Sequence, residues 1–166
     1  GIINEVSKTT SKPSDVLKLA NQNLVTYIKN SHIRYVTSFY VSINLDTKLL
    51  TYSKAGHPAA YIIRNQQIIE LETGGLFLGM YEDEEYEQSH VQLEAKDRLF
   101  LYTDGLLETK NSTDELFGID RLHQISIETK LLPVSEAETL IYKSVQSFGA
   151  TDEIADDQTL IIVEIN

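Results

Sequence analysis

The change in hydrophobic period along the chain is the feature that most limits its possible folds. In residues 13–29, apolar side chains such as Leu17 and Ala20 recur at helical spacing, and Pro13 suits the first turn of a helix. From residue 37 onward the spacing becomes an alternation of apolar and polar residues, which is typical of strands. The sequence therefore predicts a helix over residues 13–29, followed by a region rich in β-strands.

Six short strands are predicted in this region, over residues 37–44, 49–53, 60–64, 68–72, 90–94 and 98–103. The first four form two pairs, and the members of each pair are separated by only a few residues. Each pair is therefore expected to be an antiparallel hairpin. The sixth strand is apolar on both faces, so we expect it to be a central strand between layers.

Helical patterns return after residue 117. Residues 118–130 are moderately helical, and residues 135–148 form the stronger pattern, in which Ser135 and Glu138 would make a capping box. The expected buried stripe of this second helix consists of Leu140, Ile141, Val145 and Phe148. Residues 159–165 read as a last strand. Antiparallel hairpins with helices between or after them predict an α+β layered fold.

Composition excludes several classes of function. The 166 residues contain no cysteine, so disulfides, thiol nucleophiles and cysteine-based metal sites are ruled out. The net charge of −11 argues against sequence-independent nucleic-acid binding and against attraction to an anionic membrane. No run approaches the ~18 apolar residues of a transmembrane helix. We expect a single domain over residues 1–166, located in the cytoplasm, with neither nucleic acid nor a membrane as its partner.

Asp104 is the first candidate for chemistry. It lies at the end of the strongly apolar strand 98–103 and is followed by Gly105. A rigid strand would deliver this carboxylate to a surface turn, and the glycine would let another group approach closely. An Asp-Gly turn that closes a strand explains the same residues, and on spacing alone it is the more ordinary interpretation.

The second candidate is the pair Asp156 and Asp157, just before the strand at 159–165. Two adjacent carboxylates repel each other, and a hard divalent cation such as Mg²⁺ or Mn²⁺ would relieve that repulsion. A solvated loop is the alternative, because Asp152 and Glu153 lie nearby. If the strands that carry the two candidates are neighbours, the acidic positions meet at one rim of the sheet.

Other features carry less weight. His57 follows a strand, and a structural imidazole in a turn is favoured over a contact to a substrate. The acidic run at 82–85 is expected to be a solvated, self-repelling loop rather than a metal site. No Gly-x-Ser-x-Gly elbow, P-loop or Gly-x-Gly-x-x-Gly pattern occurs, so neither a serine hydrolase nor a P-loop or Rossmann nucleotide site is supported.

Five short motifs occur in a recognisable order: Ala55-Gly56-His57-Pro58, Leu78-Gly79-Met80, Thr103-Asp104-Gly105 within residues 97–108, Glu115-Leu116-Phe117-Gly118 and Asp156-Asp157-Gln158-Thr159. In this order they resemble the metal-dependent serine/threonine protein phosphatases (the PPM family). The resemblance is strongest to the bacterial branch that includes the sporulation and general-stress regulators SpoIIE and RsbU, and it covers most of the chain.

The resemblance implies a fold, a cofactor and a reaction. The fold would be a two-layer antiparallel β-sandwich flanked by helices, with two Mn²⁺ or Mg²⁺ ions held by aspartates and waters at one rim. A metal-activated water would attack the phosphoserine directly, so no side chain acts as the nucleophile. The implied site residues are the metal-binding Asp104 and Asp156 with the neighbouring Asp157, and the turn or motif residues Gly105, Gly56 and His57.

The resemblance also implies a partner and a departure from the family pattern. The substrate would be a phosphoserine or phosphothreonine on a regulatory protein, typically an anti-anti-sigma protein in a partner-switching circuit. The family's metal-bridging aspartate, in a Gly-Asp-x-x-Gly-His-Gly segment, has no counterpart here, and the chain starts at Gly1 without a methionine. We therefore expect a partial phosphatase domain whose first strands are missing.

Such a partial domain should bind Mn²⁺ weakly, hydrolyse phosphate esters negligibly on its own and self-associate through an unpaired sheet edge. Two alternatives remain open at this point. One is a non-catalytic phosphatase-like module that binds a regulatory protein, and the other is an unrelated acidic α+β domain in which the motifs occur by chance.

Overall fold

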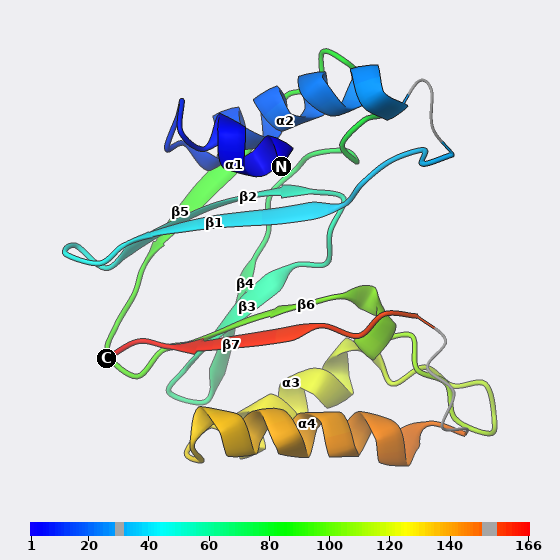
Figure 1. Ribbon diagram of the computed structural model, residues 1–166. Helices are drawn as coiled ribbons and strands as arrows, with labels where there is room; N and C mark the ends of the chain where they lie inside the picture. The colour runs from blue at the N-terminus through cyan, green and yellow to red at the C-terminus, as the bar shows by residue number, and fades with distance from the viewer. Residues whose placement is uncertain (29–31, 151–155) are drawn as a thin grey trace. The chain divides into compact units, whose positions relative to one another are not determined.

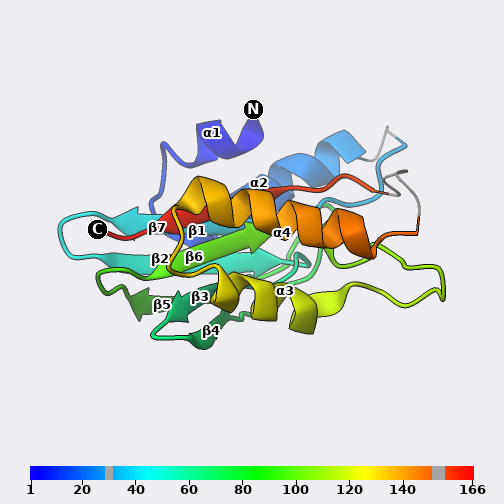
Figure 2. The same ribbon diagram turned by 90° about the horizontal axis from the view of Figure 1, so that it is seen from below.

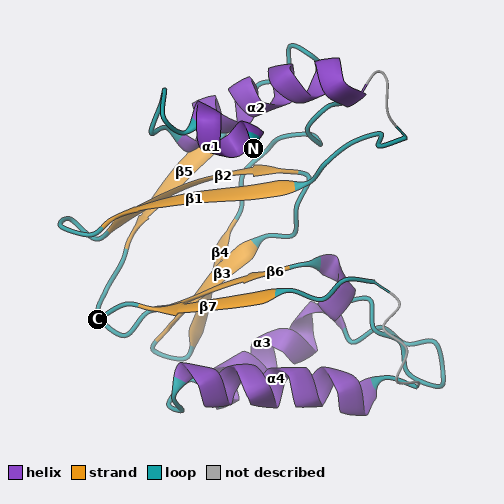
Figure 3. Ribbon diagram, in the orientation of Figure 1, coloured by secondary structure: helices purple, strands orange, loops and turns teal. Residues whose placement is uncertain are grey.

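The structure is a computed structural model, and it describes residues 1–28, 32–150 and 156–166. The chain divides into two compact units: one consists of Gly1–Ala59 and Leu71–Leu93, and the other of Ala60–Glu70 and Glu94–Asn166. Each unit contains one sheet with helices packed on it (Figures 1 and 3). The prediction of an α+β chain with antiparallel sheets is confirmed.

The first unit is built on a three-stranded sheet with the order β1-β2-β5. Its elements are α1 (Ile2–Val6), α2 (Pro13–Ile28), β1 (Ser38–Asn44), β2 (Leu49–Ala55) and β5 (Gln88–Gln92). The predicted hairpin is confirmed, since β1 and β2 are antiparallel. The predicted helix is α2; its expected last position, residue 29, lies outside the described residues. The sequence did not reveal α1, because five residues are too few for a periodic pattern.

The acidic run at 82–85 is exposed as expected except at Glu84, which is half-buried, and its carboxylates are not simply self-repelling. The Glu84 carboxylate accepts a hydrogen bond from the Leu76 backbone N–H at 3.0 Å, and Glu85 pairs with Lys18 of α2. Tyr86, the next residue, is buried in a small core with Leu17. The run is therefore attached to its own unit, because a neighbouring lysine and a backbone donor satisfy charges that the sequence pattern left unpaired.

The second unit is built on a four-stranded sheet with the order β4-β3-β6-β7. Its elements are β3 (Ala60–Arg64), β4 (Gln67–Leu71), β6 (Arg98–Tyr102), the 3₁₀ turn η1 (Asp104–Leu106), α3 (Gly118–Glu128), α4 (Val134–Phe148) and β7 (Leu160–Glu164). The tight turn between β3 and β4 has positive φ at both Asn65 and Gln66, which suits a two-residue hairpin. The prediction that the apolar strand at 98–103 is central is confirmed, because β6 lies between β3 and β7.

Helices α3 and α4 lie side by side over one face of this sheet (Figure 2). Aromatic residues of the strands, Tyr61 and Phe100, stack at 4.9 Å between ring centroids. They pack in one buried cluster with Leu122 of α3 and with Ile141 and Val145 of α4. This core holds β6 and β7 against the helices and so supports the loops that follow β6 and precede β7.

Two details predicted for α4 are wrong. The helix begins at Val134 with Pro133 as its N-cap and has no side-chain cap, so Ser135 and Glu138 do not form a capping box. Ser135 already lies inside the first turn, where it cannot act as the N-cap. Leu140 is 40% exposed, because Ala137 rather than Leu140 completes the buried stripe.

The helices of the described ranges are all too short or too polar to cross a membrane.

Candidate metal centre

The two acidic candidates lie at the same edge of the second sheet. Strands β6 and β7 are antiparallel neighbours with Tyr102 opposite Leu160, so the end of β6 lies beside the start of β7. Asp104 comes just after β6, in η1, and Asp156 and Asp157 come just before β7. The condition stated from the sequence, that the two strands be neighbours, is therefore met.

The backbones of the two acidic loops are in direct contact at Gly105. A Cβ atom added to this buried glycine would lie 2.5 Å from the Asp157 carbonyl oxygen and 3.1 Å from that of Asp156. Atoms at 2.5 Å from a backbone oxygen would clash, so no larger residue fits here unless the loops separate. The close approach expected from the Asp-Gly sequence is thus an approach of the second acidic loop.

Thr103 joins the same two loops by hydrogen bonds. Its hydroxyl donates to the Asp157 carbonyl oxygen at 2.9 Å and accepts from the Thr159 backbone N–H at 2.9 Å. Its backbone N–H donates to the Thr159 carbonyl oxygen at 3.1 Å. These three bonds extend the pairing of β6 and β7 beyond the strands and set the separation of the acidic positions.

The Gln158 side chain also joins the two acidic loops by hydrogen bonds, and the sequence alone did not indicate this role. Its amide donates to the Gly105 carbonyl oxygen at 3.3 Å and to the Thr109 hydroxyl at 3.0 Å. The Thr109 hydroxyl in turn donates to the same Gly105 carbonyl at 3.2 Å. The only available signal was the position of Gln158 inside the Asp-Asp-Gln-Thr motif, since contacts with Thr109 cannot be read from spacing.

The carboxylates of Asp104, Asp156 and Asp157 are exposed to solvent. One Asp156 carboxylate oxygen accepts a hydrogen bond from the Asp157 backbone N–H at 2.8 Å. The Asp104 carbonyl oxygen accepts from the N–H groups of Leu107 and Glu108 at 2.8 and 2.9 Å, which holds η1 in place. The loops are thus ordered by backbone and neutral side-chain contacts, and their carboxylates remain accessible to a ligand from solution.

The atoms at this rim that could bind a metal are the carboxylate and carbonyl oxygens, and hard divalent cations such as Mg²⁺ and Mn²⁺ prefer oxygen ligands. The contact at Gly105 brings the two acidic loops to one place. However, the described residues contain no group of three or more acidic or histidine side chains that could hold a metal. The donors therefore fit a divalent cation in kind, and they supply only part of a usual ligand set.

Gly56 and His57 belong to the first unit. Gly56 has a φ of +59°, and a Cβ added to it would lie 2.3 Å from the Phe77 ring. The His57 Nδ1 lies 3.1 Å from the Thr37 hydroxyl oxygen. These contacts agree with the structural interpretation of this motif.

Comparisons with known proteins extend these observations. The family model described as stage II sporulation protein E (SpoIIE) matches residues 1–166. Phosphoserine phosphatase RsbU of Bacillus subtilis (strain 168) is 30% identical over 166 residues, which cover 97% of this chain and 48% of RsbU. The chain thus spans about half the length of this curated relative.

Solved structures share the fold. The SiaA-PP2C domain of Pseudomonas aeruginosa superposes with a TM-score of 0.88 at 17% identity, covering 99% of this chain and 66% of that one. The Mn-presoaked phosphatase domain of SpoIIE from Bacillus subtilis superposes with a TM-score of 0.62 at 22% identity, covering 90% of this chain and 65% of that one. At these identities the likeness shows the fold alone, which is the one that the sequence motifs implied.

Proposed function

Because this chain belongs to the stage II sporulation protein E (SpoIIE) family, we propose that it is part of a metal-dependent protein phosphatase domain. The observation that carries the proposal is the contact of the two acidic loops at Gly105, next to the Asp157 carbonyl oxygen. We propose further that both units, over residues 1–166, belong to this one domain.

Asp104 and Asp156 are proposed to hold Mn²⁺ or Mg²⁺, with Asp157 beside them. When bound, such ions lower the pKa of water and stabilise negative charge on phosphoryl oxygens. The chain's own residues prepare this site. Thr103 and Gln158 fix the spacing of the loops through the contacts described above, so that less ordering is required when a cation binds.

The proposed substrate is a phosphoserine or phosphothreonine on a regulatory protein of the cytoplasm, such as an anti-anti-sigma protein in a partner-switching circuit. The name of the relative RsbU, a phosphoserine phosphatase, supports this substrate class. The weak Mn²⁺ binding, negligible activity and self-association expected of these 166 residues stay predictions.

A second candidate function is a non-catalytic module that binds a regulatory protein. One observation favours it: three or more acidic or histidine side chains do not gather into a metal-binding group within the described ranges. The two candidates differ in whether the acidic loops bind a divalent cation, and that difference can be measured directly.

The test is to titrate Mn²⁺ into the chain, and into its Asp104→Asn and Asp156→Asn variants, and to measure the binding affinity by isothermal titration calorimetry. Loss of a ligating carboxylate should weaken Mn²⁺ binding by about tenfold or more. Even the mutation of a residue that only hydrogen-bonds to a metal ligand typically lowers metal affinity by about 10–100-fold. Asp120→Asn, an exposed aspartate of α3 away from the rim, is the matched control and should bind as the unchanged chain does.

Equal Mn²⁺ affinity in all four proteins would remove the metal assignment and leave the binding module as the better explanation. A parallel assay with p-nitrophenyl phosphate and Mn²⁺ examines the expected inactivity. Robust, metal-dependent turnover would overturn that expectation while supporting the phosphatase proposal.

A further inference from the structure

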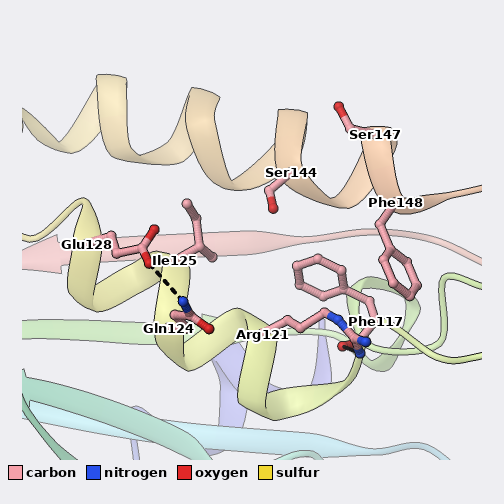
Figure 4. A pocket seen from close by; sticks show the side chains of 8 residues that line it. All are labelled: Phe117, Arg121, Gln124, Ile125, Glu128, Ser144, Ser147 and Phe148. Atoms are coloured by element: carbon pink, nitrogen blue, oxygen red, sulfur yellow. Dashed lines mark hydrogen bonds between the residues drawn. The ribbon is translucent and has the colours of Figure 1, made fainter.

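A groove of about 420 Å³ runs between α3 and α4 on the second unit (Figure 4). This volume lies in the range of sites for small molecules. The lining consists of Phe117, Arg121, Gln124, Ile125 and Glu128 from α3 and its N-cap, and of Ser144, Ser147 and Phe148 from α4. None of these residues belongs to the acidic rim described above.

Arg121 is the cationic group of the groove, and its guanidinium is held in place. Its Nη1 donates to the carbonyl oxygens of Leu116 and Phe117, both at 3.0 Å. The guanidinium carbon also lies over the Phe148 ring, 4.7 Å from its centroid. Within the described residues, Nε and Nη2 have no hydrogen-bond partner. One whole edge of the guanidinium is thus positioned and still available.

The same unit shows what this edge binds elsewhere. The Nε and Nη2 of Arg64 donate to the two carboxylate oxygens of Asp97 at 3.0 and 2.6 Å. This side-on, bidentate pairing is the geometry by which a guanidinium recognises a carboxylate. The free edge of Arg121 presents the same pair of donors, which makes a carboxylate the complementary group.

The rest of the groove suits an apolar body beside that carboxylate. The Phe117 and Phe148 rings meet edge to face at 5.5 Å between centroids, and Ile125 adds an aliphatic surface about two turns along α3 from Phe117. The Ser144 hydroxyl points into the groove from α4 (Figure 4), and no described residue hydrogen-bonds to it. The lining is thus mixed, with three apolar and five polar or charged residues among its eight, and a ligand with one charged end and one apolar end matches it.

Glu128 limits the charge of the occupant. It lies about two turns along α3 from Arg121 and is held by a hydrogen bond from the Gln124 amide at 2.9 Å. A ligand with several negative groups, such as a nucleotide, would place one of them near this carboxylate and be repelled. A single negative charge at the Arg121 end avoids that repulsion.

We propose that the α3–α4 groove binds a small organic monocarboxylate with an apolar body of about the size of one aromatic ring. The carboxylate lies on the Nε–Nη2 edge of Arg121, and the apolar body lies against Phe117, Ile125 and Phe148. This proposal does not depend on the proposed phosphatase function, because it uses none of the residues at the acidic rim.

The probe for the test is 3-phenylpropionate, titrated into the chain while backbone amide shifts are followed by NMR. Saturable shifts are expected in α3 and α4. The neutral analogue 3-phenyl-1-propanol and the Arg121→Gln variant should each bind about ten- to hundredfold more weakly, because a charge-assisted contact is lost. Arg34→Gln, which removes an exposed arginine of the first unit, is the matched control and should leave binding unchanged.

A second variant guards against a loss of binding caused by misfolding. Ser144→Leu fills the groove from the half-buried face of α4 and leaves Arg121 in place. It should abolish the shifts while the remaining spectrum stays that of the folded chain. Absence of saturable binding to the unchanged chain, or equal binding of 3-phenylpropionate to the unchanged chain and a folded Arg121→Gln variant, would overturn the proposal.

Discussion

At Gly105 the two acidic loops pack closely against each other. An added methyl group would meet the backbone oxygen of Asp157, and backbone cannot move aside as a flexible side chain can. We expect Gly105→Ala to lower the free energy of unfolding by about 1–3 kcal/mol, as overpacking usually does. Urea denaturation measures this change, and a Mn²⁺ titration should show weaker binding in the same variant.

The matched control for this prediction is Gly74→Ala. Its added methyl would meet only the end of the Glu87 side chain, at 3.0 Å, so the neighbour can shift at low cost. If both variants unfold at the same urea concentration, the contact between Gly105 and Asp157 is not the tight one inferred here.

The residues of the candidate site differ in how far sequence alone could predict them. Asp104 and Asp156 stand beside strongly apolar strands, so local pattern and motif were enough to single them out. Gln158 and Thr109 could not be found in this way, because their importance lies in a hydrogen bond between residues 49 positions apart. The sequence alone identifies a carboxylate as a candidate metal ligand. It does not identify the side chains that hold the loop of that carboxylate in place.

Among the elements, α2 is joined to a distant loop by one buried side chain. Asn21 is fully buried in the middle of the helix. Its side chain accepts a hydrogen bond from the Gly79 N–H and donates one to the Tyr81 carbonyl oxygen, both at 2.7 Å. Asn21→Leu would leave the Gly79 N–H without its partner and the Tyr81 carbonyl oxygen with only a long bond from the Glu84 N–H, at 3.4 Å, so we expect a loss of about 1–3 kcal/mol.

Hydrogen exchange provides a local measurement of this effect, since the Gly79 amide should exchange faster in Asn21→Leu. Asn23→Leu is the control on the same helix: Asn23 is exposed and bonds only to the Leu19 carbonyl oxygen within α2. Unchanged protection of the Gly79 amide in Asn21→Leu would show that the loop is held by other contacts.

The elements themselves were largely predictable, and their ends were less so. The apolar periods that predict α2, β6 and β7 are local and strong, so these elements appear where the sequence placed them. The start of α4 was misplaced because a Ser-x-x-Glu pattern competes with Pro133, which sets the true N-cap. Which residue begins a helix depends on the chain that leads into it as well as on its own propensity.

At the scale of the whole molecule, the shifted pKa values of His123 and Glu164 predict how the free energy of unfolding depends on pH. Burial lowers the pKa of His123 below its usual 6.5, partly offset by Glu70 and Asp120. Its imidazole ring lies edge-on against Tyr61 in the core, at 4.5 Å between centroids. As pH falls through 6.5 the unfolded chain takes up a proton before the folded one, so the free energy of unfolding decreases below that pH.

Glu164 adds a second loss at lower pH. A hydrogen bond from Arg98, at 2.7 Å, lowers the pKa of the Glu164 carboxyl below its usual 4.5. Its contribution to stability is present above the unfolded pKa and is lost as pH falls through the folded one. Stability should therefore decline in two stages, first through His123 and then through Glu164.

Urea denaturation from pH 8 down to about pH 2 would measure both stages, because the second lies below the usual carboxyl pKa of 4.5. His123→Gln should flatten the first decline, whose slope from one histidine is at most about 1.4 kcal/mol per pH unit. His90→Gln, an exposed histidine of β5, is the control and should keep the full decline. An unchanged curve in His123→Gln would show that burial of this imidazole does not govern the first stage.

Local patterns were sufficient to predict the three longer helices and the hairpins and to single out two acidic positions as candidates, because hydrophobic period and turn chemistry act over a few residues. Contacts between residues far apart in the sequence could not be predicted in this way, because they depend on long-range packing. The folded structure places β5 and β6 in different sheets although they follow each other, seats Gly105 against Asp157 and forms the groove between α3 and α4. Such pairings arise from burial shared among distant segments, and no window of sequence contains that information.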